Sequence, residues 1–137
     1  MSCSLSYQDP ARAIDWLVGA FGFRVRISIP NAAGGIEHSE LLFGDAVIMV
    51  AGERQQEPLL ARSPKSLGGA NTRGLFIYVD DVEAHFAQAV AAGAVVARPL
   101  ATTDYGPEYW MDRGYAALDP EGHAWYFAQR LRDPPQG

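Results

Sequence analysis

The chain has 137 residues, 48% hydrophobic and 20% charged, a composition typical of one compact globular domain with its own core. Sixteen acidic against eleven basic residues give a net charge of −5 without any run of basic residues, which disfavours a nucleic-acid partner. The apolar stretches are strand-sized and no signal-like segment opens the chain, so we expect neither a membrane span nor secretion. A single cysteine, Cys3, favours the cytoplasm, and Lys65 as the only lysine beside many arginines resembles the composition of GC-rich bacteria.

The first half of the chain is predicted to form a strand, a helix and three more strands. Asp9 is a good helix N-cap, Pro10 suits the first helical position, and Gly22 suits the left-handed residue that ends a helix. Alternation of apolar and polar residues indicates strands in the flanking segments. The predicted elements are a strand at 4–7, a helix at 10–21 and strands at 23–29, 36–43 and 46–50.

The second half repeats this order after a polar segment. Proline and paired glycines at 53–70 predict a linker with a short helical turn. The elements predicted after it are a strand at 75–79, a helix at 82–92, strands at 94–98, 109–117 and 124–129, a loop at 102–107 and a loose tail from 132. Segment 7–23 also recurs 71 positions later at 78–94, with Tyr, Asp and Gly at matching places, which indicates two duplicated units.

Short motifs along nearly the whole chain carry a family resemblance. They are Asp9–Leu17 with Phe21–Phe23, His38–Met49, Tyr78–Asp81, Ala91–Ala94, Tyr105–Gly106 and Asp119–Trp125. In this order they resemble the vicinal oxygen chelate superfamily, which includes glyoxalase I, bleomycin-resistance proteins and extradiol dioxygenases. The resemblance implies an α+β fold of two βαβββ modules, residues 3–51 and 73–130 with linker 52–72, whose eight strands form a mixed sheet around a cavity. It also implies a homodimer, because a module of about sixty residues is too small to cover both faces of its sheet alone.

Metal-dependent members of the superfamily place ligands on the first and fourth strands of each module. The resemblance transfers these positions to Ser2, Met49, Gly74 and Tyr126. These residue types cannot supply the His and carboxylate donors that a divalent first-row ion prefers, so we expect no metal and no cofactor at the usual site. A non-standard site at His38 and Glu40 stays open, because residues two apart on a strand share a face; a third ligand such as Glu108 would have to come from another strand. The alternative is a hydrogen-bonded His–Glu pair.

The other polar and aromatic candidates have structural explanations. His85 falls in the middle of the second predicted helix, and we expect it to be structural. His123 follows the turn 119–122 and is expected to brace that turn. Trp125 alternates with Tyr126 and is expected to pack beneath a helix as part of the core.

Aromatic residues gather where the resemblance places the cavity. The candidate ligand-binding residues are Met49, Phe76, Tyr78, Tyr105, Glu108, Tyr109, Trp110 and Tyr126. Three aromatics within six loop residues favour a flat or apolar ligand held by stacking, on a surface expected to lack a cluster of cations. Many relatives carry Arg where this chain has Glu108, which would favour a neutral or cationic ligand. The rings could instead form core or a dimer interface.

Two functions from different classes therefore remain open. The first is a metal-independent protein that sequesters an aromatic or cationic small molecule in the manner of bleomycin-resistance proteins. The second is a lyase, isomerase or dioxygenase of the same superfamily. Such an enzyme would use a non-standard metal at His38 and Glu40, or one of these two residues as a general base.

Overall fold

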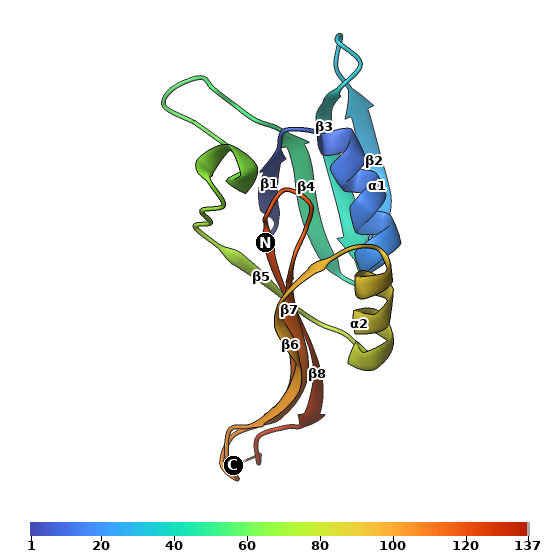
Figure 1. Ribbon diagram of the computed structural model, residues 1–137, viewed down its shortest axis with the longest axis vertical. Coiled ribbons are helices and arrows are strands. Elements are labelled where there is room, and N and C mark those ends of the chain that lie inside the picture. Colours follow the sequence, from blue (N-terminus) through green and yellow to red (C-terminus); the bar gives the residue numbers. More distant parts are fainter. Residues whose placement is uncertain (137) are drawn as a thin grey trace. The chain divides into compact units, whose positions relative to one another are not determined.

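Each half of the chain forms a four-stranded sheet with one long helix, in the order predicted from the sequence (Figure 1). The computed structural model describes residues 1–136. They divide into a first unit, Met1–Asn71 with Pro120–His123, and a second unit, Thr72–Asp119 with the segment from Ala124 onward. None of the helices within residues 1–136 is long and apolar enough to pass through a lipid bilayer.

The strands of each unit have the same topology. The elements of the first unit are β1 (Cys3–Tyr7), α1 (Pro10–Phe21), β2 (Arg24–Pro30), β3 (Ile36–Phe43), β4 (Ala46–Gly52) and the short 3-10 helix η1 (Pro64–Leu67). Those of the second are β5 (Gly74–Tyr78), α2 (Val82–Ala91), β6 (Val95–Asp104), β7 (Met111–Leu118) and β8 (Ala124–Arg132). The sheet orders are β1-β4-β3-β2 and β5-β8-β7-β6; the first pair in each order is parallel and the other pairs are antiparallel. The predicted α+β fold of two βαβββ modules is confirmed, with its eight strands in two mixed sheets.

Helix α1 begins and ends where the sequence predicts. The side chain of Asp9 accepts a hydrogen bond from the amide N of Arg12 at 3.1 Å, and Pro10 occupies the first helical position. Gly22 ends the helix with a φ of 83°, a left-handed conformation that favours glycine. Leu17 and its apolar neighbours are buried, and the helix contacts β1, β2 and β4. The helix therefore covers one face of the sheet and leaves the other face uncovered by it.

Helix α2 covers one face of the second sheet in the same way. Its N-cap is Asp81, one residue after the aspartate that matches Asp9 in the duplication; Asp81 accepts from the amide N of Ala84 at 3.1 Å. His85 Nδ1 lies 2.7 Å from the hydroxyl of Tyr115, and Trp125 is fully buried. The expected structural role of His85 and core position of Trp125 are therefore confirmed.

The turn after β7 is held by hydrogen bonds within the first unit. Glu121 is 9% exposed and accepts hydrogen bonds from the amides of Gln8 and Asp9 and from the hydroxyl of Ser63. His123 is buried and donates from Nε2 to the carbonyl of Ser6 at 2.8 Å. The prediction that His123 braces this turn is confirmed.

The β6–β7 hairpin is longer than the sequence predicts. A loop was expected at 102–107, but Thr102, Thr103 and Asp104 continue β6 by pairing with the start of β7. Strand β8 likewise continues to Arg132 instead of ending at 129, because its end pairs with Met111. The aromatic segment 105–110 is therefore a tight hairpin tip, closed by the hydrogen bond from the amide of Tyr105 to the carbonyl of Trp110.

Candidate functional site

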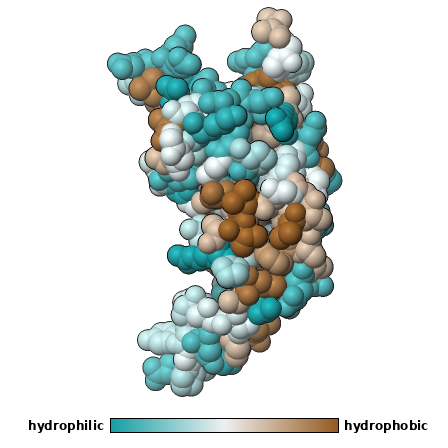
Figure 2. Space-filling view, in the orientation of Figure 1, coloured by the Kyte–Doolittle hydropathy of each residue, from teal (hydrophilic) through white to brown (hydrophobic). Residues whose placement is uncertain are grey.

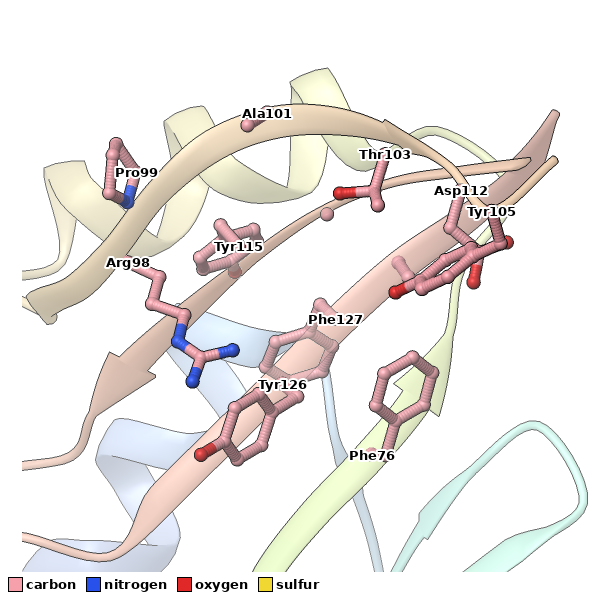
Figure 3. A pocket seen from close by; sticks show the side chains of 12 residues that line it. Phe76, Arg98, Pro99, Ala101, Thr103, Tyr105, Asp112, Tyr115, Tyr126 and Phe127 are labelled. Carbon is pink, nitrogen blue, oxygen red and sulfur yellow. The ribbon is translucent and has the colours of Figure 1, made fainter. Parts of the chain in front are cut away.

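A pocket of about 170 Å³ opens on the sheet of the second unit (Figure 3). Tyr115 and Phe127 point from this sheet toward His85 of α2. Because side chains alternate along a strand, their neighbours Gly114, Ala128 and Tyr126 belong to the opposite face, which α2 leaves uncovered. The pocket lies on this face.

The floor of the pocket consists of small residues in register across three strands. Gly114 of β7 pairs with Ala101 of β6 on one side and with Ala128 of β8 on the other. A Cβ atom on Gly114 would lie 2.7 Å from the carbonyl oxygen of Phe127 and 3.1 Å from the Cβ of Ala128, so no side chain fits there without a shift of backbone. The hollow therefore follows from this row of small side chains.

Aromatic rings form one wall of the pocket. Phe76 and Tyr126 pair across β5 and β8, and their rings stack with an interplanar angle of 13° and 6.5 Å between centroids. The ring of Tyr126 lies over Gly74, where a Cβ atom would come within 2.6 Å of it. Two of the positions transferred from metal-dependent relatives, Gly74 and Tyr126, thus serve ring packing. The residues there do not fit a metal site.

A buried carboxylate lies beside the rings. Asp112 accepts a hydrogen bond from Arg130 Nε at 2.7 Å on one oxygen and from the hydroxyl of Tyr78 at 2.9 Å on the other. Burial and then the neighbouring Asp112 raise the pKa of Tyr78 against the effect of Arg130, so the phenol stays protonated and remains a donor. The guanidinium of Arg130 also lies 4.8 Å from the ring centroid of Tyr78 and 5.6 Å from that of Trp110. The negative charge of Asp112 is thereby compensated by the positive charge of Arg130.

A second guanidinium, that of Arg98, reaches into the pocket. It extends from β6 toward Tyr126 and lies 5.8 Å from the centroid of that ring (Figure 3). No carboxylate among residues 1–136 forms an ion pair with it, whereas Arg130 is paired with Asp112 and Asp133. Among the residues that line the pocket, Arg98 is therefore a cation without an ion pair, whereas Arg130 lies beside the pocket and is paired. The expectation of a surface without a cluster of cations stays a prediction.

The structure brings together some of the predicted ligand-binding residues and leaves others aside. Phe76, Tyr105 and Tyr126 line the pocket. Tyr78 and Trp110 lie beside it, against Arg130, and Trp110 also packs on Tyr105 with 4.9 Å between ring centroids. Glu108 and Tyr109 are exposed on the hairpin tip and do not line the pocket.

Arg98, Asp112 and Arg130 were not among the ligand-binding residues predicted from the sequence. Alternation along the last strand would have placed Arg130 on the same face as Tyr126, had that strand been extended beyond 129. Asp112 lies inside a predicted strand, but its role depends on partners 34 and 18 residues away in the chain. Arg98 was assigned to the end of a strand that in fact continues past it.

The remaining predicted residues lie on the sheet of the first unit. Glu40 pairs with Met49 across β3 and β4, and His38 Nε2 lies 3.3 Å from Glu40 Oε1. Arg26, which the sequence analysis also missed, donates to the same carboxylate from Nε at 2.7 Å. Hydrogen bonds from Arg26 and then from His38 hold the pKa of Glu40 below its ordinary value.

His38 and Glu40 do share a face, as their spacing predicts. Within the part of the chain that the structure describes, no three or more His, Cys, Asp or Glu side chains gather in a way that could hold a metal ion. The pair instead forms a charged cluster with Arg26, whose contact with Glu40 is also an ion pair. This arrangement corresponds to the hydrogen-bonded alternative.

A second pocket, of about 310 Å³, lies beside the start of α1 in the first unit. It is lined by Arg12 and Lys65 among others. Three backbone amides at this helix end, those of Gln8, Asp9 and Arg12, already have carboxylate partners. The side chain of Asp9 caps the helix, and the carboxylate of Glu121 accepts from the amides of Gln8 and Asp9. These three amides are therefore not available to a ligand in this pocket.

Comparison with known proteins places the chain in a family. The family model for the Glyoxalase/Bleomycin resistance protein/Dioxygenase superfamily matches residues 2–127. The chain is 31% identical over 134 residues to the uncharacterized protein Mb0911c of Mycobacterium bovis, covering 97% of this chain and 84% of that protein. Among solved structures, TioX from Micromonospora sp. ML1 is 36% identical with a TM-score of 0.72 and 94% of both chains covered. TnmS3, an antibiotic binding protein from Streptomyces sp. CB03234, is 21% identical with a TM-score of 0.68, covering 94% of this chain and 93% of that one, and shows the fold alone. The chain thus belongs to the glyoxalase/bleomycin resistance protein/dioxygenase superfamily.

Proposed function

We propose that the protein binds and sequesters a small aromatic molecule in the pocket of the second unit. The observation that carries this proposal is the combination of a floor of small residues with a wall of stacked rings, Phe76 and Tyr126. The pocket volume of about 170 Å³ is close to that of a cavity of about 150 Å³ that accommodates benzene. One aromatic ring with a small substituent would therefore fill it, either as a whole ligand or as one part of a larger one.

The exposure of these rings supports a ligand over a purely structural role. Phe76 is 57% exposed and Tyr105 52% exposed, although both line the pocket. Separately from these rings, Figure 2 shows a group of apolar residues, in brown, at the surface among hydrophilic ones. Uncovered apolar surface of this kind is unfavourable in water and marks a binding site or an interface. A second copy of this chain could cover the rings instead, because we also propose that the protein is a homodimer.

The binding function is favoured over acid–base catalysis by the state of Glu40. A general base works best with a pKa near the working pH, whereas Arg26 and His38 lower the pKa of Glu40. Glu40 is therefore a weak base that already has two partners. TnmS3, an antibiotic binding protein of similar fold, supports a small-molecule ligand for this protein but does not indicate which molecule it is. The proposed setting is the bacterial cytoplasm, which the single cysteine and the mycobacterial relatives support.

The proposal can be tested by filling the pocket. In Ala101→Leu the longer side chain would occupy the floor from the exposed strand β6, so the core remains intact. Ala97→Leu adds the same volume to the same strand outside the pocket and serves as the matched control. We expect NMR shift changes on titration with single-ring aromatic fragments in the wild type and in Ala97→Leu, but not in Ala101→Leu. Equal binding by all three proteins would contradict the proposed site.

A further inference from the structure

The charges around the pocket are unevenly compensated. The negative charge of Asp112 is matched by Arg130 and by the hydroxyl of Tyr78. The positive charge of Arg98 has no carboxylate partner among residues 1–136. Although the whole chain carries a net charge of −5, the pocket itself therefore presents a local positive charge.

The ring of Tyr126 orients Arg98 without satisfying it. At 5.8 Å from the ring centroid, the guanidinium lies near the outer limit of about 6 Å for a cation–π contact. Such a contact supplies no oxygen acceptor, and the guanidinium of Arg98 donates no hydrogen bond to another of residues 1–136. Figure 3 shows this group extending from β6 into the pocket toward the ring of Tyr126. The donors are therefore available to a ligand in the pocket.

From this arrangement we propose that the ligand is an aromatic acid, whose ring fills the pocket and whose carboxylate accepts hydrogen bonds from Arg98. This inference rests on the proposed binding function and specifies the chemical class of its ligand. The planar fork of a guanidinium matches a carboxylate with two parallel hydrogen bonds, which a neutral amide accepts less well and a cation opposes. A cationic ligand, one of the two classes that the sequence favours, would meet the like charge of Arg98 in this pocket.

Three isosteric probes separate ring binding from charge recognition. Benzoate, benzamide and benzamidine share one ring and one planar substituent, and at pH 7 they are anionic, neutral and cationic. Each fits a pocket of about 170 Å³, and NMR titration measures dissociation constants on the order of millimolar, as expected for so few atoms. We expect benzoate to bind most tightly and benzamidine most weakly, with benzoate alone losing affinity as ionic strength rises.

The matched variants are Arg98→Gln and Arg24→Gln. Both remove one positive charge from the chain, but Arg24 lies on β2 of the first unit, outside the pocket. In Arg98→Gln, benzoate should lose about tenfold in affinity, as expected for a charge-assisted hydrogen bond, and benzamide should keep its affinity. Arg24→Gln should bind all three probes as the wild type does.

The outcomes distinguish this inference from the function on which it rests. If all three probes bind the wild type and Arg98→Gln equally, the ring-binding function stands and the aromatic-acid inference is overturned. Tightest binding of benzamidine would overturn it as well and favour a cationic ligand. If none of the probes binds the wild type, both the aromatic-acid inference and the proposed binding function fail.

Discussion

Replacing Glu121 by alanine should destabilise the first unit more than any exposed substitution. Its carboxylate accepts from the amide of Gln8 at 2.6 Å, the amide of Asp9 at 2.9 Å and the hydroxyl of Ser63 at 2.6 Å. Alanine would leave three donors without this partner. Each unsatisfied buried donor costs about 1–3 kcal/mol, and the partial exposure of the two amides lets water replace some of the loss. We therefore expect a loss of about 3–5 kcal/mol, a large part of the roughly 5–15 kcal/mol by which domains are stable.

Urea denaturation followed by circular dichroism at pH 7 would measure this loss. The matched control is Glu108→Ala, which removes an equally charged side chain from the exposed hairpin tip and should change the free energy of unfolding by less than about 0.5 kcal/mol. Glu121→Gln should fall between the two, because its amide oxygen can still accept while its amide nitrogen faces a donor. If Glu121→Ala costs no more than Glu108→Ala, the hydrogen bonds of this turn do not stabilise the unit as argued.

Four further predictions address the site and the assembly. Trp110→Ala should weaken binding of an aromatic ligand by about 1–3 kcal/mol, measured by calorimetry, because Trp110 packs on Tyr105; the fold should not change. If the substitution instead dissociates a dimer, and a broad screen finds no aromatic binder, these rings belong to an interface. Arg26 and His38 lower the pKa of Glu40 from 4.5, so the stabilising contribution of its carboxylate is present above pH 4.5 and is lost as pH falls through the lowered value. The difference in free energy of unfolding between wild type and Glu40→Gln, measured by urea denaturation, should therefore be smaller at pH 3 than at pH 7. Sedimentation at micromolar concentration should show a homodimer, and a species of 14.9 kDa would count against it. Metal analysis after dialysis should find no stoichiometric Zn, Ni, Fe or Mn, and a retained ion would point to His38 and Glu40.

The local signals in the sequence predicted the elements well, because they depend on neighbours in the chain. Asp9 and Gly22 set the ends of α1 through a side-chain cap and a left-handed turn. Strand β3 at 36–43 was predicted with its observed bounds, since a glycine-rich turn precedes it and a Gly–Asp turn follows. The predicted ends of β6 and β8 were wrong, because these strands continue as far as a partner strand, distant in the sequence, can pair with them.

The same distinction explains which pocket residues could be predicted. Alternation along β5 and β8 identified Phe76 and Tyr126, since the side chains of a strand project to known faces. Arg98 and Arg130 were not predicted, because their roles come from tertiary contacts. Arg98 contacts the ring of Tyr126 on another strand, and Arg130 donates to the carboxylate of Asp112. Periodicity indicates the face of a residue, but it does not indicate which charges find a partner on that face.

The two sheets share one strand order but carry different chemistry. Across the first sheet, Met49 pairs with Ser4 and with Glu40; across the second, Tyr126 takes the place of Met49 and pairs with Phe76 and Ala116. Ala116 therefore stands where the first unit has Glu40, and Gly114, two residues earlier on its strand, stands where the first unit has His38. Because the backbone register is shared, the hollow of the second unit follows from side-chain volume. An imidazole and a carboxylate in one unit correspond to a hydrogen atom and a methyl group in the other, so the unit without the polar pair is the one with room for a ring.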